Sequence, residues 1–276
     1  MLSGQIHYIE LQETQIVFGN TLAKANSIKK IALDTLDIQN DLSALNNFLN
    51  DISLNLVKEK GKTLFFLHGM WESKRTHFKE AYEYLDTFYL KNPTSEIGAI
   101  VIITWDASDY FYKNVQKSGL RAVPTFSKLL NILSDFKQNQ PTISLNLLCH
   151  SLGNLILHES LQVEKSLIFD KLILSAPDMP IPHENNQQIY KNIESIATNI
   201  LLLRNHRDRA LLFSGIRNEQ KRLGRAGFSN TFETKIKVQE VAQFKDTVGF
   251  YPNLSNHMQF RCSQKVAMIM VDFLND

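Results

Sequence analysis

Residues 143–153 read Ile-Ser-Leu-Asn-Leu-Leu-Cys-His-Ser-Leu-Gly, a largely apolar run that leads to a serine with a small residue two positions away on either side. The run is typical of a buried strand, and the apolar residues after Ser151 recur at helical spacing. A strand, a sharp turn and a helix therefore meet at Ser151, an arrangement that lifts a serine hydroxyl clear of a sheet. The free N–H groups at the start of such a helix favour negative charge that develops beside them. This stretch predicts an α/β fold with a candidate nucleophile at Ser151.

The residues that flank Ser151 decide how closely the strand and the helix can approach. Gly153 is small enough for close packing, but Cys149 stands at the other flank, where glycine is usual. Taken alone, the pattern also fits an ordinary turn between a strand and a helix. Its interpretation depends on what the rest of the chain offers.

Length and composition define the class of protein. The chain has 276 residues, of which 43% are hydrophobic and 21% charged, which predicts a soluble globular protein with a sizeable core. A net charge of +2 gives no reason to expect nucleic acid as a partner. The apolar runs are too short for stable membrane insertion, and the N-terminus lacks a signal-peptide pattern. Because Cys149 and Cys262 show no metal-like pairing, a reduced, cytoplasmic setting is expected.

From Lys60 onward, short apolar runs alternate with helical patterns. This alternation predicts a mostly parallel sheet with helices on both faces. The expected strands are 63–67, 99–104, 143–148, 172–174, 200–204 and 235–241, and the expected helices are 78–90, 126–136, 185–196 and 266–274. Residues 106–123 are predicted to form a small cover over the site.

The first part of the chain differs from the rest in texture. Residues 6–17 are expected to hold one or two strands, and residues 41–57 an amphipathic helix. We therefore predict an N-terminal strand and helix segment, 1–59, packed on the core of a larger domain, 60–276.

Candidate site residues follow several of the expected strands. Active sites in mostly parallel sheets lie at the carboxyl ends of the strands. A serine hydroxyl needs a histidine that takes its proton and a carboxylate that orients the histidine. In this class of fold the chain order is serine, acid, histidine. His257 is the only histidine after all the expected strands, which makes it the expected base, with His183 and His206 as weaker alternatives.

Two aspartates compete for the role of the acid. Asp208 follows the strand at 200–204, which is the position that this class of fold uses most often. Asp178 follows the preceding strand and is the alternative acid, although next to Pro177 it could equally start a turn or cap a helix. Arginines on both sides of Asp208 could instead make it a simple ion-pair partner.

Two backbone N–H groups are expected to form an oxyanion hole. Leu152, directly after the serine, supplies one of them. Met70 supplies the other from the turn after the strand at 63–67, where Gly69 lets the backbone pass close to the site. His68 and His150 are predicted to be structural.

The remaining features point to a site without a metal or cofactor. The sequence has no metal-binding motif and no glycine-rich phosphate loop. Trp71, Trp105 and Tyr110 are candidates for lining a substrate pocket. The basic stretch 204–225 fits a solvated helix face, or else a surface that attracts an anionic substrate or a lipid surface.

In their order along the chain, several short segments resemble the α/β-hydrolase superfamily and, within it, a bacterial esterase/lipase-like family of unknown function. These segments are Phe65-Phe66-Leu67-His68-Gly69, Thr104-Trp105, Cys149-His150-Ser151-Leu152-Gly153-Asn154, Ala176-Pro177-Asp178, Asp208-Arg209-Ala210-Leu211, Arg222-Leu223-Gly224 and Asn256-His257. The resemblance runs from about Lys60 to the C-terminus. It implies an α/β-hydrolase fold, a Ser151, Asp208, His257 triad and a small-molecule acyl ester substrate. The sequence departs from the family pattern at Cys149, at Met70-Trp71, and at Asp106, where proline is frequent.

Three functions fit this sequence. The first is a serine hydrolase of the carboxylesterase or lipase type. The second is an interaction module that keeps the fold without catalysis, because fold alone does not fix function. The third is an acyltransferase, in which an alcohol or thiol takes the place of water. The oligomeric state is left open.

Overall fold

The computed structural model describes residues 5–13, 15–20, 29–32, 38–56, 60–70, 83–229, 232–244 and 256–276. Within these ranges, nine strands form one sheet in the order β3-β2-β1-β5-β4-β6-β7-β8-β9. The strands are β1 (Gln5–Leu11), β2 (Gln15–Asn20), β3 (Lys29–Ala32), β4 (Lys62–Leu67), β5 (Ile97–Trp105), β6 (Ser144–His150), β7 (Phe169–Ser175), β8 (Ala197–Arg204) and β9 (Lys237–Glu240). In the part of the sheet that runs β1-β5-β4-β6-β7-β8-β9, all neighbouring strands are parallel. Strand β2 pairs antiparallel with both β1 and β3.

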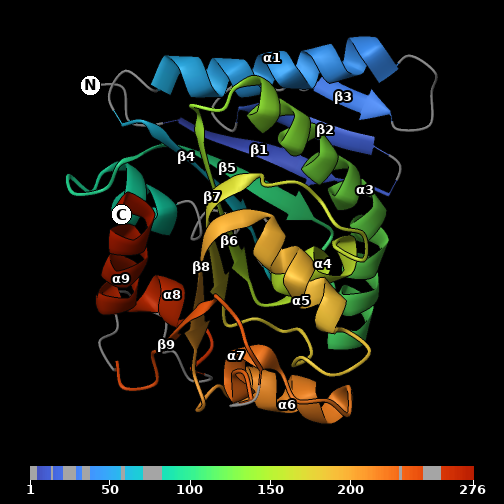
Figure 1. Cartoon of the computed structure of the whole chain (residues 1–276), viewed down its shortest axis with the longest axis vertical. Helices are drawn as coiled ribbons and strands as arrows, with labels where there is room; N and C mark the ends of the chain where they lie inside the picture. Colours follow the sequence, from blue (N-terminus) through green and yellow to red (C-terminus); the bar gives the residue numbers. More distant parts are fainter. Residues whose placement is uncertain are drawn as a thin grey trace.

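Helices cover both faces of this sheet (Figure 1). They are α1 (Ile38–Leu56), η2 (Asp86–Leu90), α3 (Tyr112–Asn139), α4 (Leu152–Ser160), α5 (Gln187–Ser195), α6 (Arg209–Arg217), α7 (Leu223–Ala226), α8 (Gln259–Cys262) and α9 (Gln264–Asn275). Helices α1, α3, α4 and α5 lie on one side, and η2, α8 and α9 lie on the other (Figure 1). The predicted fold class, a mostly parallel sheet between two layers of helices, is confirmed.

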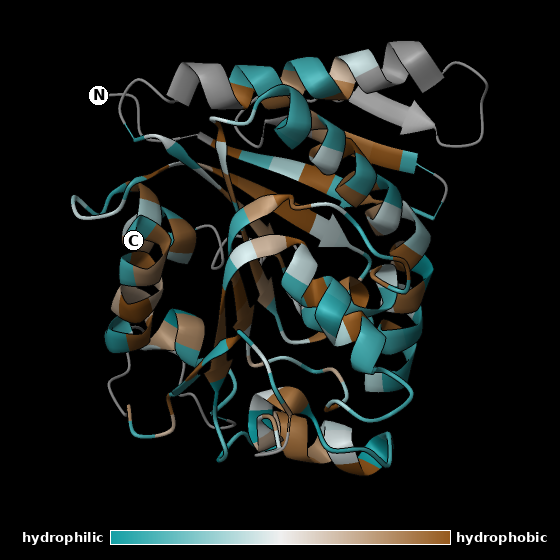
Figure 2. Ribbon diagram, in the orientation of Figure 1, coloured by the Kyte–Doolittle hydropathy of each residue, from teal (hydrophilic) through white to brown (hydrophobic). Residues whose placement is uncertain are grey.

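The core is divided by the sheet into two apolar layers. In β4, Phe65 and Leu67 belong to the layer under α3 and α4, whereas Leu64 and Phe66 belong to the layer under α9. Successive side chains of a strand point to opposite faces, so a strand buried on both sides is apolar along its whole length. Figure 2 shows this as central strands that are mostly brown. Among the described residues, no helix is long and apolar enough to cross a membrane.

The N-terminal segment extends the same sheet. Strand β1 pairs with β5, and β2 and β3 continue the sheet outward. Helix α1 contributes Leu45, Leu49 and Ile52 to the larger of the two apolar layers. The division of the chain at residue 60 stays a prediction.

Two helices differ from the sequence prediction. Helix α3 begins at Tyr112, so most of the segment predicted as a cover, 106–123, is its first half. Helix α6, which follows Asp208 directly, lies in the basic stretch 204–225, for which a solvated helix face was considered but no helix bounds were predicted. Residues 78–82 of the predicted helix 78–90 lie outside the described residues, and its end forms η2.

His7 gives the first strand a pH-dependent stability. Its ring lies edge-on to Phe48 with 5.6 Å between ring centroids, and among the described residues neither ring nitrogen has a hydrogen-bond partner. Burial lowers the pKa of His7 from 6.5 to about 4, so the unfolded chain binds more protons than the folded one between these values. Stability conferred by the neutral ring is thus complete above the higher value and falls as the pH drops. We expect His7→Phe to remove a loss of about 3 kcal/mol between neutral pH and about pH 4.

Urea unfolding at the two pH values measures this effect. His183→Phe, at an exposed histidine, is the matched control and should unfold with the same pH dependence as the unmodified protein. An equal pH dependence in His7→Phe and in the unmodified protein would contradict the assignment.

Candidate active site

Ser151 occupies a strained turn between β6 and α4. Its φ of 50° and ψ of −120° lie in a region that residues with a side chain rarely adopt. The Ser151 N–H donates to the Ser175 carbonyl at 3.1 Å, and the Asn154 side chain donates to the Ser151 carbonyl at 3.2 Å. These bonds tie the turn to the end of β7 and to its own helix, so the surrounding structure holds the strained residue in place.

Two glycines allow the backbone to close around Ser151. A Cβ on Gly153 would lie 2.5 Å from the Leu67 carbonyl oxygen, so only glycine lets α4 lie this close to the end of β4. A Cβ on Gly69 would lie 2.8 Å from the Ser151 Cβ. The turn after β4 therefore passes directly beside the serine. The sequence departure at Cys149 leaves a fully buried thiol, and burial raises the pKa of this Cys149 thiol.

Ser151, His257 and Asp208 are brought together at the carboxyl end of the sheet. The Ser151 Oγ lies 2.8 Å from His257 Nε2, and His257 Nδ1 lies 2.7 Å from Asp208 Oδ2. All three side chains are buried or nearly so. A continuous chain of hydrogen bonds thus runs from the hydroxyl through the imidazole to the carboxylate, in the order that a serine nucleophile requires.

Both oxygens of Asp208 have defined partners. Oδ1 accepts the Leu211 N–H at 2.9 Å and so caps the N-terminus of α6, which leaves Oδ2 for His257. The carboxylate is fully buried and forms an ion pair with His257, and among the described residues neither flanking arginine pairs with it. The helix cap fixes the side chain, and the fixed side chain orients the imidazole.

The loops that carry the acid and the histidine are joined to each other. The Asn205 side chain donates to the Asn256 carbonyl at 2.6 Å and to the Gln259 side chain at 2.8 Å. In the other direction, the Asn256 side chain donates to the Arg207 carbonyl at 3.4 Å. These contacts hold residues 205–208 and 256–259 in register, so the distance between Asp208 and His257 does not depend on their own bond alone.

Asp178, the alternative acid, belongs to a different group of side chains. It accepts hydrogen bonds from Tyr112 at 2.8 Å and Ser214 at 2.5 Å, and it pairs with Arg222 at 3.1 Å. Burial and the nearby Asp178 carboxylate raise the pKa of Tyr112 to about 12, so this phenol stays a donor. With these partners Asp178 joins β7 to α3, α6 and the start of α7. The structure places Asp208, and not Asp178, against the histidine.

The two backbone groups expected to bind an oxyanion lie beside Ser151. Leu152 is the first residue of α4, where backbone N–H groups have no partner within the helix. Met70 follows Gly69, whose backbone is in close contact with the Ser151 side chain. Leu152 directly follows Ser151, and Met70 directly follows Gly69; that their N–H groups bind an oxyanion stays a prediction.

The structure does not place the predicted pocket residues around an open pocket. Trp105 is 1% exposed, and its indole N–H donates to the His68 carbonyl at 3.0 Å. It therefore holds the turn after β4 in place from the core. Tyr110 is 78% exposed. Trp71 lies outside the described residues. The reason for the difference is that Trp105 still belongs to β5 and points into the core, whereas Tyr110 lies before α3.

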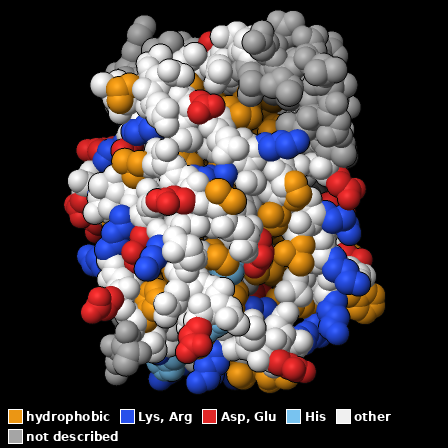
Figure 3. Space-filling view, turned by 45° about the vertical axis from the view of Figure 1, so that its right-hand side comes forward, with side chains coloured by type: hydrophobic (Ala, Val, Ile, Leu, Met, Phe, Trp, Pro, Cys, Tyr) orange, Lys and Arg blue, Asp and Glu red, His pale blue; other side chains and the backbone are white. Residues whose placement is uncertain are grey.

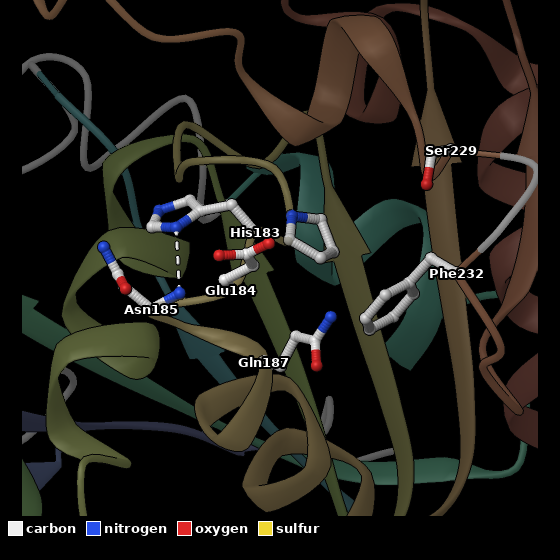
Figure 4. Close-up of a pocket in the computed structure, with 7 residues that line it drawn as sticks. His183, Glu184, Asn185, Gln187, Ser229 and Phe232 are labelled. Atoms are coloured by element: carbon white, nitrogen blue, oxygen red, sulfur yellow. Dashed lines mark hydrogen bonds between the residues drawn. The ribbon is translucent and has the colours of Figure 1, made fainter.

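A hollow of about 470 Å³ lies at the loop that follows β7 (Figure 4). Its lining was not foreseen from the sequence and consists of Pro182, His183, Glu184, Asn185, Gln187, Ser229 and Phe232. The Asn185 N–H donates to His183 Nδ1 at 3.3 Å, drawn as the dashed line in Figure 4. The one sequence feature that pointed to this region was the run of polar residues around residue 185, at the start of the helix predicted at 185–196.

The other histidines have partners away from the hydroxyl. His68 lies 2.8 Å from the Thr104 hydroxyl and stacks on Trp105. His150 packs against Phe260 with 4.1 Å between ring centroids, and its ring centroid lies 5.0 Å from that of His257. His206 pairs with Glu240 at 3.3 Å. Among the described residues, no three His, Cys, Asp or Glu side chains are grouped to hold a metal ion.

The fold is similar to that of several solved structures. MenH from S. aureus shares 13% identity at a TM-score of 0.44, over 79% of this chain and 94% of its own. A Trichoderma reesei cutinase in complex with a phosphonate inhibitor shares 12% identity at a TM-score of 0.32, over 87% of this chain and 93% of its own. No curated protein matches the sequence. The sequence profile of one family, described as alpha/beta hydrolases of unknown function, matches residues 44–271. The chain therefore belongs to this family of α/β-hydrolases, DUF900.

Proposed function

We propose that the protein is a serine hydrolase that cleaves an ester or related acyl substrate through an acyl-enzyme on Ser151. One observation carries the proposal, namely the unbroken path from Ser151 Oγ through His257 to Asp208, with distances of 2.8 and 2.7 Å. Hydrogen bonds of this kind are what a weak nucleophile needs for activation. The membership in an α/β-hydrolase family of unknown function is consistent with it.

In the first step the substrate is cleaved and the serine is acylated. With a proton on Nδ1 shared with Asp208, His257 Nε2 is free to accept the Ser151 proton as Oγ attacks the carbonyl carbon. The carbonyl oxygen becomes negative and is bound by the Met70 and Leu152 N–H groups. When the bond to the leaving group breaks, His257 returns the proton to the leaving alcohol.

In the second step water regenerates the enzyme. His257 takes a proton from water, the resulting hydroxide attacks the acyl carbon, and Ser151 leaves with the proton from His257. Asp208 keeps the imidazole oriented and stabilises its charged form in both steps. The residues act without a cofactor in this scheme.

Labelling with a fluorophosphonate probe tests the proposal. We expect the purified protein to react with the probe, because only an activated serine attacks phosphorus at a useful rate. Ser151→Ala and His257→Ala should lose labelling, since the first removes the attacking oxygen and the second removes the base. Ser108→Ala, at an exposed serine, is the matched control and should label like the unmodified protein.

The outcome separates the three functions that fit the sequence. A folded protein that does not label would contradict the hydrolase and favour an interaction module. Labelling followed by transfer of the acyl group to an added alcohol faster than to water would favour an acyltransferase.

A further inference from the structure

Helix α6 presents an apolar stripe to solvent. Leu212, Phe213 and Ile216 are 40%, 62% and 65% exposed. Ile216 follows Phe213 by three residues and Leu212 by four, so the three side chains project from one side of the helix. The opposite side is the buried one, with Leu211 and Ser214 facing the protein. Three large apolar side chains of α6 therefore face solvent and take no part in packing the helix against the protein.

A pair of exposed aromatic side chains lies in the segment just before α3, whose first residue contacts α6. Tyr110 and Phe111 are 78% and 73% exposed just before α3. The first residue of α3, Tyr112, holds this segment against α6, because its hydroxyl lies 2.8 Å from the Ser214 hydroxyl. Five of the nine large hydrophobic residues that are exposed in the described part of the chain belong to this surface. Single exposed apolar residues are common in soluble proteins, but such a concentration marks an interaction site.

Basic residues flank the apolar stripe of α6, whereas the exposed Asp106 and Asp109 precede Tyr110 and Phe111. Arg209 and Arg217 lie at its two ends on the same side of α6, and both are exposed. A hollow of about 640 Å³ beside Leu212 and Ile216 is lined in part by Lys221 and Arg225. Among the described residues that line this hollow, Glu219 is the single carboxylate. Figure 3 shows hydrophobic and basic side chains, with some acidic ones, along the lower end of the molecule, where Figure 1 places α6 and α7.

We propose that this surface, Tyr110, Phe111, Arg209, Leu212, Phe213, Ile216 and Arg217, docks the protein on a membrane that contains anionic lipid. Aromatic and aliphatic tips between arginines are what a helix lying in the lipid headgroup region presents. Each basic residue near an anionic membrane strengthens binding, and the apolar side chains enter the boundary of the acyl chains. A second copy of this chain would have to bring the arginines of both copies together, so charge favours the lipid over self-association.

The docked surface lies beside the candidate active site. Asp208 is the capping residue of α6, so the helix that would touch the lipid begins at the proposed acid. The proposed docking does not depend on the chemistry of Ser151, because it rests only on the exposed apolar side chains and the arginines of this surface. Binding and catalysis can therefore be tested separately.

Flotation of the full-length protein with vesicles tests the proposal. We expect binding to vesicles of equimolar phosphatidylcholine and phosphatidylglycerol, weaker binding in high salt, and little binding to phosphatidylcholine alone. Phe213→Ser with Ile216→Ser should weaken binding about tenfold or more. The matched control, Val163→Ser with Leu167→Ser, removes two exposed apolar side chains elsewhere and should bind like the unmodified protein.

The charge contribution has its own pair of variants. Arg209→Gln with Arg217→Gln should weaken binding about tenfold or more, at about fivefold for each arginine. Lys191→Gln with Lys237→Gln, at exposed lysines elsewhere, should leave it unchanged. Circular dichroism and fluorophosphonate labelling would show that all four variants are folded.

Three results would overturn the proposal. The first is equal binding to neutral and anionic vesicles. The second is equal weakening by the test and control variants. The third is a dimer in solution that is lost in the Phe213→Ser, Ile216→Ser protein while no variant binds vesicles, which would assign the surface to a second copy of the chain.

Discussion

Asp208→Asn is expected to lower kcat for a small activated ester by roughly 10⁴-fold. The reason lies in how the two oxygens of Asp208 are used. Oδ1 accepts the Leu211 N–H, so the amide oxygen of an asparagine would take that place and turn its NH₂ group toward His257. A donor facing Nδ1 forces the proton of the neutral imidazole onto Nε2. The nitrogen next to Ser151 then cannot accept the hydroxyl proton.

Asp178→Asn is the informative comparison for this prediction. Its partners are Tyr112, Ser214 and Arg222 and not His257, so we expect kcat to fall less than about tenfold in the fraction of protein that is folded. Initial rates of p-nitrophenyl acetate hydrolysis, with active protein counted by fluorophosphonate labelling, measure both variants. A loss in Asp178→Asn as large as in Asp208→Asn would contradict the assignment of the acid.

The central strands of the sheet could be predicted because they are mostly apolar. Runs such as 143–148 are buried on both faces by two layers of helices, and this leaves a strong signal in the sequence. The ends of such strands are also readable, and with them the positions of Ser151 and Asp208. His257 followed from chain order alone.

The sequence does not show which of Asp178 and Asp208 lies against the histidine. Both follow parallel strands of the same sheet, and both lie near its carboxyl edge. They differ in their partners, because Pro180 and Arg222 pair in an isolated bridge that brings the arginine beside Asp178. A contact between residues 44 positions apart along the chain leaves no local pattern to read.

The first half of α3 and the bounds of α6 could not be predicted, for opposite reasons. Helix α3 contains Gly119 and Pro124, which usually interrupt helices. Here Gly119 lies where a Cβ would be 3.3 Å from Trp105, so packing against the tryptophan outweighs the low helix propensity. Helix α6 was hidden because its larger apolar residues face solvent, which is the reverse of the usual pattern.

Breaking the buried ion pair of Asp178 and Arg222 is expected to lower the stability of the fold by a large amount. Both side chains are almost completely buried, with 3.1 Å between Nε and Oδ1, and the Arg222 Nε–H also donates to Ser214 at 3.0 Å. Removing one member of such a pair leaves a charge in the interior without its counter-charge. We expect Arg222→Met to lower the free energy of unfolding by about 3–5 kcal/mol.

Urea unfolding of a double-mutant cycle measures this coupling. Asp178→Asn with Arg222→Met should lose less stability than the sum of the two single variants, because neither change then leaves an unpaired charge. Glu96→Gln breaks the more exposed pair with Lys62 and should change stability by less than about 1 kcal/mol. Additive losses in the cycle would mean that the carboxylate and the guanidinium stabilise the fold independently. Since the Asp178 N–H donates to the Ser151 carbonyl at 3.1 Å, a coupled pair would also tie the stability of this layer to the position of the serine.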